Sequence, residues 1–301
     1  MPESKLKYFL QLHLIVFIWG FTAILGALIS IDAVPLVWFR MLLAVFFILL
    51  YFIVKKKKLS IDKKTLLQFL LTGIIIALHW ITFFKAIKVS NVSIALVTMS
   101  TGAFFTSLIE PLFFKRRIKA VEILLGLLVI GGLYIIFNFE TTYYLGIIYA
   151  LISAFLAALF SVLNGIFIKK TAADVISFYQ LFFGVVFVTV FLFFTDSFTA
   201  GFFNLKISDW FYLLILSSIC TAYAFIVSVK IMKHLTPYTV MLTINLEPVY
   251  AIILALLIFG DKEKMNPEFY YGAFIVLFVV LLNGIIKNSS AIRQKMKKNK
   301  K

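Results

Sequence analysis

The sequence has few of the charged residues on which a water-soluble protein depends. They make up 14% of its 301 positions, against about 25% in an ordinary soluble domain. A soluble fold of this length needs charge to cover its surface. The scarcity therefore excludes a soluble enzyme, a nucleic-acid-binding module and a disordered chain. Acidic residues are especially scarce, since only 13 stand against 29 lysines and arginines.

Cysteine is nearly absent, and the common catalytic motifs are wholly absent. Cys220 is the single cysteine, which excludes an intramolecular disulfide and a cysteine-based metal cluster. The sequence contains no HExxH, no phosphate-cradling glycine loop, no GxSxG and no cluster of aspartates. We therefore expect no catalytic residues, no bound metal and no cofactor.

Long apolar runs fill the chain instead. Hydrophobic residues make up 63% of it, phenylalanine occurs 35 times, and the mean hydropathy is +1.06. A bilayer core about 30 Å thick needs about 20 apolar residues to cross it as a helix, because backbone groups in lipid must bond within their own segment. The pattern predicts an all-α integral membrane protein with ten transmembrane helices. The predicted spans are Tyr8–Ile31, Val34–Val54, Thr65–Ile87, Val92–Phe114, Ile118–Phe137, Leu145–Ile168, Val175–Thr195, Trp210–Val229, Tyr238–Phe259 and Phe269–Ile286.

The positive charges predict an orientation. Of the 29 lysines and arginines, 23 fall in the segments that alternate onto the side of the N-terminus, and 5 fall on the other side. Because positive charge is retained in the cytoplasm, we expect both termini inside a plasma membrane, most simply a bacterial inner membrane. The net charge of +16 is thus explained by topology and contact with anionic lipid rather than by a nucleic-acid partner.

Ten spans divide into two repeats of five. We place these repeats at residues 1–138 and 139–287, followed by a basic cytoplasmic tail at residues 288–301. Five is odd, so the second repeat must start on the opposite side of the membrane, which gives the inverted topology that alternating-access carriers use. At an offset of 146 residues, Thr101 of the fourth span aligns with Glu247 of the ninth.

A polar stripe marks the ninth predicted span. Its members are spaced 3, 4, 4 and 3 residues apart, so they share one face of a continuous helix. They are Thr236, Thr239, Thr243, Glu247 and Tyr250. A polar face inside a membrane is expected to line a cavity or contact a neighbouring helix.

Glu247 is the leading functional candidate on this stripe. Pro248 beside it has no amide hydrogen, so the carbonyl of Ile244 loses its helical partner and a kink is expected there. Burial in lipid favours a protonated carboxyl group, which makes Glu247 a candidate for proton coupling. The alternative is a structural glutamate that is hydrogen-bonded between helices.

Five further residues stand out because they are polar or aromatic within apolar spans. Arg40 is placed to bind an anionic group, unless it extends to the outer interface. His79 either titrates near neutral pH or is a buried neutral side chain. Trp80 and Trp19 are candidates for an aromatic wall, and Asn164 for a polar contact, with helix packing as the alternative for each.

Several short motifs resemble a known family. They are Trp19 with Gly20, Arg40 before an apolar run, Ala86 and Lys88 followed by Ser90, Leu246 with Glu247 and Pro248, and Gly260 with Asp261 ahead of Gly272. The chain resembles the drug/metabolite transporter superfamily in its EamA branch over nearly its whole length. The resemblance implies a carrier of two inverted five-span repeats that exports or exchanges small metabolites.

The sequence therefore predicts a secondary transporter that works by alternating access. The expected partners are a small-molecule metabolite, first of all an amino acid or a related compound, and membrane lipid. Nucleic acid is not an expected partner, and the oligomeric state is open. Export is the expected direction. The alternatives are a membrane-embedded enzyme acting on a lipid intermediate and a passive channel. The predicted substrate-binding residues are Trp19, Arg40, His79, Trp80, Thr101, Asn164, Thr243, Glu247 and Tyr250.

Overall fold

The structure is a computed structural model that describes residues 3–115, 120–139, 141–199, 201–279 and 282. All regular secondary structure in these ranges is helical, and no strand occurs among them. The all-α prediction is thus confirmed for the described part of the chain.

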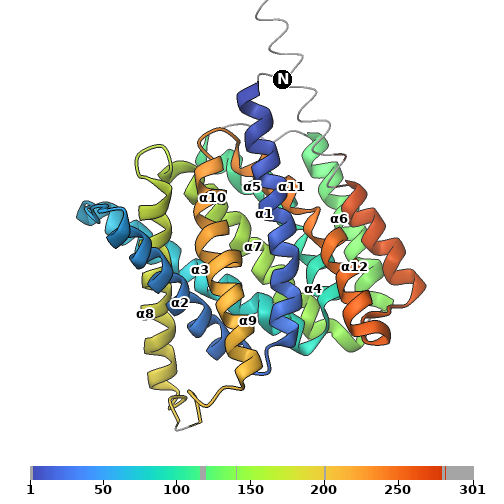
Figure 1. Ribbon diagram of the computed structural model, residues 1–301. Helices are drawn as coiled ribbons and strands as arrows, with labels where there is room; N and C mark the ends of the chain where they lie inside the picture. The colour runs from blue at the N-terminus through green and yellow to red at the C-terminus, as the bar shows by residue number, and fades with distance from the viewer. Residues whose placement is uncertain (1–2, 116–119, 140, 200, 280–281, 283–301) are drawn as a thin grey trace, which may run out of the picture.

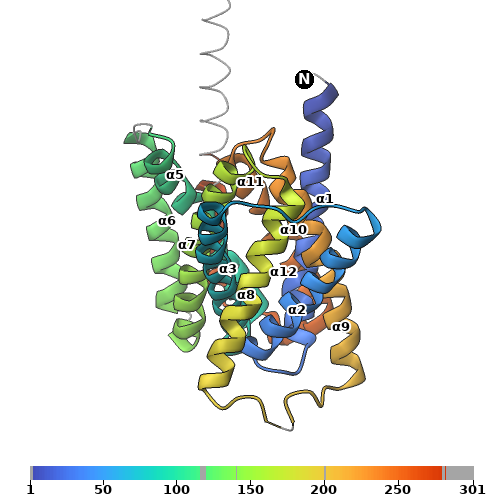
Figure 2. The same ribbon diagram turned by 90° about the vertical axis from the view of Figure 1, so that its left-hand side faces the viewer.

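The helices form one bundle in which most run roughly along a common axis (Figure 1). Figure 2 shows that the N-terminus and the loop between α8 and α9 lie at opposite ends of it. The helices are α1 (Glu3–Leu28), α2 (Ala33–Val54), α3 (Lys63–Val89), α4 (Val92–Met99), α5 (Gly102–Phe113), α6 (Ala120–Phe139), α7 (Tyr144–Phe167), α8 (Ala173–Phe194), α9 (Ile207–Ser217), α10 (Ala224–Ile231), α11 (Pro237–Ile244), α12 (Glu247–Phe259) and a last helix, Pro267–Val279. Short turns are η1 (Thr141–Tyr143) and η3 (Gly260–Glu263), both 3₁₀, and η2 (Ser218–Tyr223), which is π-helical.

Eight helical stretches among the described residues are long and apolar enough to cross a membrane. They are Leu6–Leu28, Ala33–Val54, Lys63–Val89, Val92–Phe113, Thr141–Phe167, Ala173–Phe194, Ile207–Ile231 and Pro237–Glu263. Two further apolar helices, Leu124–Ile136 and Pro267–Val279, are shorter. Large apolar side chains face outward, with Phe194 80% and Leu257 78% exposed, as suits contact with lipid. The protein is therefore a multi-pass membrane protein, while the count of ten spans stays a prediction.

Three of the predicted spans are not uniform helices in the structure. The fourth is divided between α4 and α5, and the ninth between α11 and α12. We call Ser100–Thr101 the first break and Asn245–Leu246 the second break. Where a kink is expected ahead of Pro248, the helix tightens into a 3₁₀-type turn at Asn245–Leu246, while Pro237–Glu263 as a whole still runs as one helical stretch. The eighth span contains the π-helical turn η2.

Glycine allows one close approach between helices α3 and α8. A Cβ atom on Gly73 would collide with the backbone of Gln180 and Gly184, and one on Gly184 would collide with the end of Met41. Small residues let helix backbones approach closely in membranes, where packing rather than water drives association. This contact joins the two halves of the chain, since α3 precedes residue 138 and α8 follows it.

Two buried carboxylates also join distant segments. Asp209 at the start of α9 accepts hydrogen bonds from the amide and hydroxyl of Ser30, at 2.7 and 2.6 Å. Glu263 in η3 accepts from the amides of Val92 and Ser93, both at 2.9 Å. Each carboxylate satisfies backbone donors that would otherwise be buried without a partner. These contacts fix α9 against the end of α1, and η3 against the start of α4.

Candidate substrate-binding site

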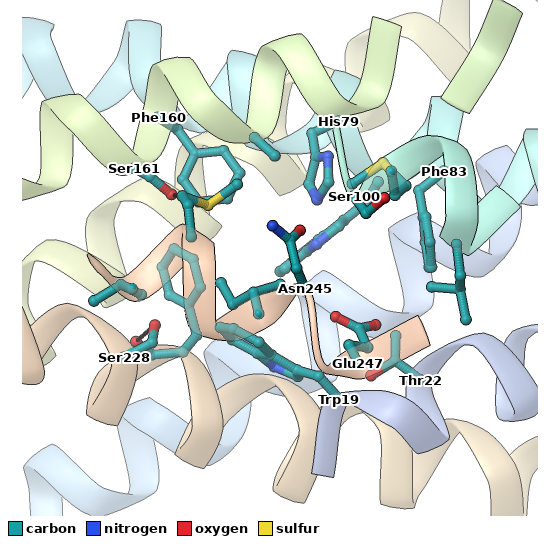
Figure 3. Close-up of a pocket in the computed structure, with 18 of the residues that line it drawn as sticks. Trp19, Thr22, His79, Phe83, Ser100, Phe160, Ser161, Ser228, Asn245 and Glu247 are labelled. Atoms are coloured by element: carbon teal, nitrogen blue, oxygen red, sulfur yellow. Dashed lines mark hydrogen bonds between the residues drawn. The ribbon is translucent and has the colours of Figure 1, made fainter. Parts of the chain in front are cut away.

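A cavity lies inside the bundle, between the two breaks. Its volume open to the centres of water-sized molecules is about 100 Å³. Figure 3 shows Asn245 and Glu247 extending into it from the second break. The lining residues are Trp19, Thr22, Arg40, His79, Trp80, Phe83, Leu96, Met99, Ser100, Ala157, Phe160, Ser161, Asn164, Cys220, Phe225, Ser228, Met232, Val240, Met241, Ile244, Asn245, Glu247 and Pro248. The lining thus combines an aromatic and aliphatic wall with a few polar groups, as small-molecule sites do.

The two breaks have similar backbone geometry. At the first, the amide of Thr101 donates to the carbonyl of Thr98, three residues earlier. At the second, the amide of Leu246 donates to the carbonyl of Thr243, again three residues earlier. This tighter 3₁₀ pattern ends one helix before the next begins. Each break places a polar residue in the lining, Ser100 at the first and Asn245 at the second.

The carboxylate of Glu247 has no hydrogen-bond or ion-pair partner within the part of the chain that the structure describes. It begins α12, directly after the second break, and it lines the cavity. The adjoining Pro248 lacks an amide hydrogen, so the helical ladder cannot continue through this point. Glu247 is therefore available to a cation that enters the cavity.

Arg40 is deeply buried in α2 and does not extend to the outer interface, with 2% of its surface exposed. Its Nε–H donates to the hydroxyl of Thr221 at 2.7 Å. Its guanidinium carbon lies 3.9 Å from the centre of the Trp80 ring, a cation–π contact. One of its two terminal nitrogens, Nη1, has no hydrogen-bond partner among the described residues. A buried donor without a partner is costly, so Nη1 marks a position for an acceptor supplied by a ligand.

Two asparagines add donors of the same kind. The oxygen of Asn164 accepts from Gln180 at 2.7 Å, which leaves the Asn164 nitrogen Nδ2 unpartnered. The nitrogen Nδ2 of Asn245 is also unpartnered, and both side chains are buried. Arg40, Asn164 and Asn245 all line the cavity. The site thus has three open N–H donors and one open carboxylate.

His79 and Trp19 are held in place by neighbouring helices. The imidazole nitrogen Nδ1 of His79 lies 3.0 Å from the carbonyl oxygen and 2.8 Å from the hydroxyl of Ser153 in α7. The bond to the carbonyl requires a proton on Nδ1. The indole Nε1 of Trp19 donates to the carbonyl of Cys220 at 3.0 Å. Both side chains form fixed parts of the wall.

Three of the nine predicted residues do not line the cavity. The hydroxyl of Thr101 donates to the carbonyl of Thr98 at 2.8 Å, and that of Thr243 donates to the carbonyl of Thr239 at 2.9 Å. Tyr250 packs edge-on against Phe17. The predicted stripe assumed one continuous helix, and the second break removes that assumption. The other six, Trp19, Arg40, His79, Trp80, Asn164 and Glu247, are brought together.

Asn245 and Ser100 are lining residues that the sequence analysis missed. On a straight helix, Asn245 would lie about 200° around the axis from Glu247, two residues on. The break allows both to face one cavity. Pro248 is the sequence signal that indicates such an interruption.

A second cavity of about 390 Å³ lies where α5, α7 and α11 meet, and Met232 lines both cavities. In Figure 1 these helix ends lie toward the end of the bundle that carries the N-terminus. Lys169, Lys233 and His234 give it a basic lining, together with Glu110. The shared residue shows that the second cavity approaches the first from this end.

Comparison with known proteins decides the family. Residues 6–138 and residues 144–285 each match the EamA-like transporter family. The chain belongs to this family. The matches also agree with the resemblance to the drug/metabolite transporter superfamily. Family membership points to a transporter rather than an enzyme.

Two individual proteins illustrate the relationship. An uncharacterized transporter from Clostridium kluyveri is 25% identical over 245 residues, which cover 78% of this EamA-family chain and 76% of the relative. A solved crystal structure superposes with a TM-score of 0.67 at 13% identity, covering 91% of this chain and 97% of that one. At that identity the structural match shows the shared fold alone.

The described residues contain no group of three or more His, Cys, Asp or Glu side chains placed to hold a metal ion.

Proposed function

We propose that this EamA-family protein is a secondary transporter that moves a small zwitterionic metabolite, an amino acid or a close relative, out of the cell. The observation that supports this proposal is that one cavity contains both unpartnered N–H donors and an unpartnered carboxylate. Arg40, Asn164 and Asn245 offer unpartnered donors, and Glu247 offers a carboxylate that has no hydrogen bond or ion pair with another described residue. An α-carboxylate matches the donors and an α-ammonium matches Glu247.

The energetics favour a ligand that carries both charges. A hydrogen bond to a charged group is worth about 1.5–3 kcal/mol, and every 1.4 kcal/mol is about tenfold in affinity. A ligand without the carboxylate leaves the open donors of Arg40, Asn164 and Asn245 without an acceptor, and a ligand without the ammonium gives up the charged bond to Glu247. Both ligands should therefore bind more weakly. Trp19, Phe83 and Phe160 provide an apolar wall for the rest of the ligand. The cavity volume suits a molecule that displaces several waters.

Alternating access is supported by the two interrupted helices. Ser100 and Asn245 lie 145 positions apart, close to the offset of 146 found in the sequence. Interrupted helices in corresponding positions of two halves mark the binding site in carriers built from inverted repeats. We propose ten spans in two inverted repeats, at residues 1–138 and 139–287, that rock about the cavity.

The proposed orientation rests on the charge distribution, whereas export is the direction that the resemblance to the EamA family implies. We propose that both termini and the basic second cavity face the cytoplasm of a cell whose plasma membrane holds the protein. Cargo then enters through the second cavity, passes Met232 and reaches the central cavity. Membrane lipid surrounds the bundle.

Glu247 also links transport to protons in this proposal. Its carboxylate holds the ammonium group when cargo is present and takes up a proton when the cavity is empty, because an isolated charge is costly in an apolar interior. The ammonium group of the cargo and the proton compete for the Glu247 carboxylate, so release of the cargo is coupled to binding of a proton.

The test is counterflow into proteoliposomes with matched compounds. The panel holds the common amino acids, the amines that lack their carboxylate and the acids that lack their amino group. We expect saturable counterflow of at least one amino acid, with both analogues at least about tenfold weaker. Empty liposomes are the control. The zwitterion proposal fails if no amino acid shows counterflow, or if an analogue is carried equally well.

Topology is tested separately by cysteine labelling. Replacing the single cysteine by Cys220→Ser gives a clean background, in which Lys57→Cys and Asn204→Cys each add one exposed thiol. We expect an impermeant reagent to label position 204 from outside and position 57 only after permeabilisation. Labelling of both positions from one side would break the proposed arrangement.

A further inference from the structure

The π-helical turn η2 (Ser218–Tyr223) contacts two side chains of the cavity wall. Its residue Cys220 accepts the indole N–H of Trp19 through its carbonyl, at 3.0 Å. The next residue, Thr221, accepts the Nε–H of Arg40 through its hydroxyl, at 2.7 Å. Two consecutive residues of one unusual turn therefore each hold a side chain of the cavity wall. π-helical turns occur frequently at functional sites.

The wide geometry of the turn explains why the Cys220 carbonyl can accept from a side chain. In an α-helix the amide of Ala224 would donate to Cys220, four residues earlier. Here it donates to Ile219, five residues earlier, and to Thr221, three residues earlier. The amide of Ala224 thus passes over the Cys220 carbonyl, which Trp19 contacts instead.

The hydroxyl of Thr221 has its roles fixed by its surroundings. It donates its only hydrogen to the carbonyl of Leu216, five residues earlier, at 2.7 Å. Its oxygen is left as an acceptor, and the Nε–H of Arg40 fills it. Because the hydroxyl donates to Leu216, it can act toward Arg40 of α2 only as an acceptor.

This bond fixes the orientation of the Arg40 guanidinium. The group is planar, so tying Nε to Thr221 and stacking the plane 3.9 Å from the Trp80 ring centre leaves little freedom. The unpartnered nitrogen Nη1 belongs to a residue that lines the cavity. Without the Thr221 acceptor, the flexible side chain has other rotamers, and Nη1 is no longer held in place.

We propose that Thr221 is a positioning residue that aims Arg40 at the carboxylate of the cargo, with the π-helical turn as its rigid support. The turn thereby determines recognition of the anionic group, although Thr221 itself does not line the cavity. The inference rests on the proposed function in one respect, namely that the cavity is the substrate site. The experiment that tests it observes the Arg40 side chain directly and does not depend on a transport measurement.

The experiment uses nuclear magnetic resonance of the whole protein with ¹⁵N-labelled arginine. The chain contains four arginines, and Arg40→Lys assigns the Arg40 signal by removing it. In the wild type we expect the Arg40 Nε–H to exchange with water at least about tenfold more slowly than that of free arginine, because it is buried and hydrogen-bonded. Thr221→Val should abolish this protection, whereas Thr221→Ser, which keeps the hydroxyl, should retain it.

Formate, the smallest carboxylate, then probes recognition. It should shift the Arg40 signal in the wild type and in Thr221→Ser, and Thr221→Val should need about tenfold more formate for the same shift. If the Thr221→Val variant does not fold, Thr221→Ala takes its place in the comparison with the wild type and Thr221→Ser. The matched control is Ser218→Ala, which removes an exposed hydroxyl from the same turn that donates to Leu214. It should leave both readings unchanged.

The outcomes separate the two proposals. Unchanged Arg40 protection and formate response in Thr221→Val, equal losses in Ser218→Ala, or no wild-type response to formate would each overturn the positioning role. If Arg40 behaves as expected but no amino acid shows counterflow, the transport proposal fails while the positioning role stands.

Discussion

The two helix breaks share a backbone pattern but differ in their chemistry. At the first break the hydroxyls of Ser100 and Thr101 donate to carbonyls three residues earlier, at 2.5 and 2.8 Å, so the break satisfies its own polar groups. At the second break the amide nitrogen of Asn245 and the carboxylate of Glu247 have no partner among the described residues. Similar interruptions therefore serve different purposes in the two halves.

The difference indicates that recognition is concentrated in the second half of the chain. The hydroxyl groups of the first break bond to their own helix, whereas the second break leaves the Asn245 amide nitrogen and the Glu247 carboxylate open to a ligand. Arg40 belongs to the first half and also lines the cavity, but its Nε–H is held by Thr221 of the second half. The symmetry of the architecture thus does not extend to the chemistry of the site.

Removing the charge at the second break should give the largest effect. Glu247→Gln keeps the size of the side chain but cannot balance a buried ammonium. Such a loss costs about 2 kcal/mol or more, or about 30-fold in affinity. Amino-acid counterflow in proteoliposomes should fall at least about 30-fold and lose its pH dependence. Wild-type flux at every pH from 5.5 to 8 would remove Glu247 from the mechanism.

Removing the open amide at the same break should have a smaller effect. Asn245→Ala deletes one donor to the cargo carboxylate, so we expect KM for the transported amino acid to rise about tenfold with little change in the maximal rate. The amine that lacks the carboxylate is the internal control, because its KM should not change. An equal rise for both compounds would show that Asn245 serves packing instead.

The corresponding changes at the first break should be nearly silent. Ser100→Ala and Thr101→Val each remove a hydroxyl that bonds only to its own helix, so counterflow should change less than about threefold. A threonine hydroxyl bonded back to its helix contributes little to helix stability. If either variant equals Asn245→Ala in effect, the two breaks are chemically equivalent and the comparison above is wrong.

The smallest effect is expected outside the membrane, at the ion pair of Lys57 with Asp174. The hydrogen bond to the Asp174 side chain raises the pKa of Lys57 above its ordinary value. A raised lysine pKa stabilises the fold below the ordinary pKa and loses that contribution as pH rises through the folded-state value. Lys57 is 40% exposed, so solvent screening limits the pair to about 0.2–1 kcal/mol.

Asp174→Asn should therefore lower the melting temperature by about 1–2 °C at neutral pH. This difference should be constant from pH 6 to 9 and shrink only in strongly alkaline solution, and amino-acid counterflow should not change. A strong loss of counterflow in this variant would make the pair part of the transport cycle.

Much of the fold was predictable from the sequence, because lipid imposes a simple rule. Apolar runs of about 20 residues must be helices in a bilayer, and eight such stretches stand in the described structure. The same rule exposes polar residues that are out of place. Arg40, His79, Asn164 and Glu247 were predicted on that ground, and all four line the cavity.

The rest depends on local departures from helical geometry. Thr243 and Tyr250 were predicted by the period of a straight helix, and the second break invalidates that period between them. Asn245 was missed for the same reason. Thr221 carries no signal in its own sequence neighbourhood, because its importance comes from Arg40, 181 positions away. Pro248 signals the second break, but no residue of the sequence signals the first break or the π-helical turn as clearly.

The most direct test of the proposed amino-acid site is a structure of the protein determined with a transported amino acid at saturating concentration. We expect density in the central cavity, with the carboxylate beside Arg40 and Asn245 and the ammonium beside Glu247. An amino acid bound only in the second cavity, or bound with these groups reversed, would contradict it.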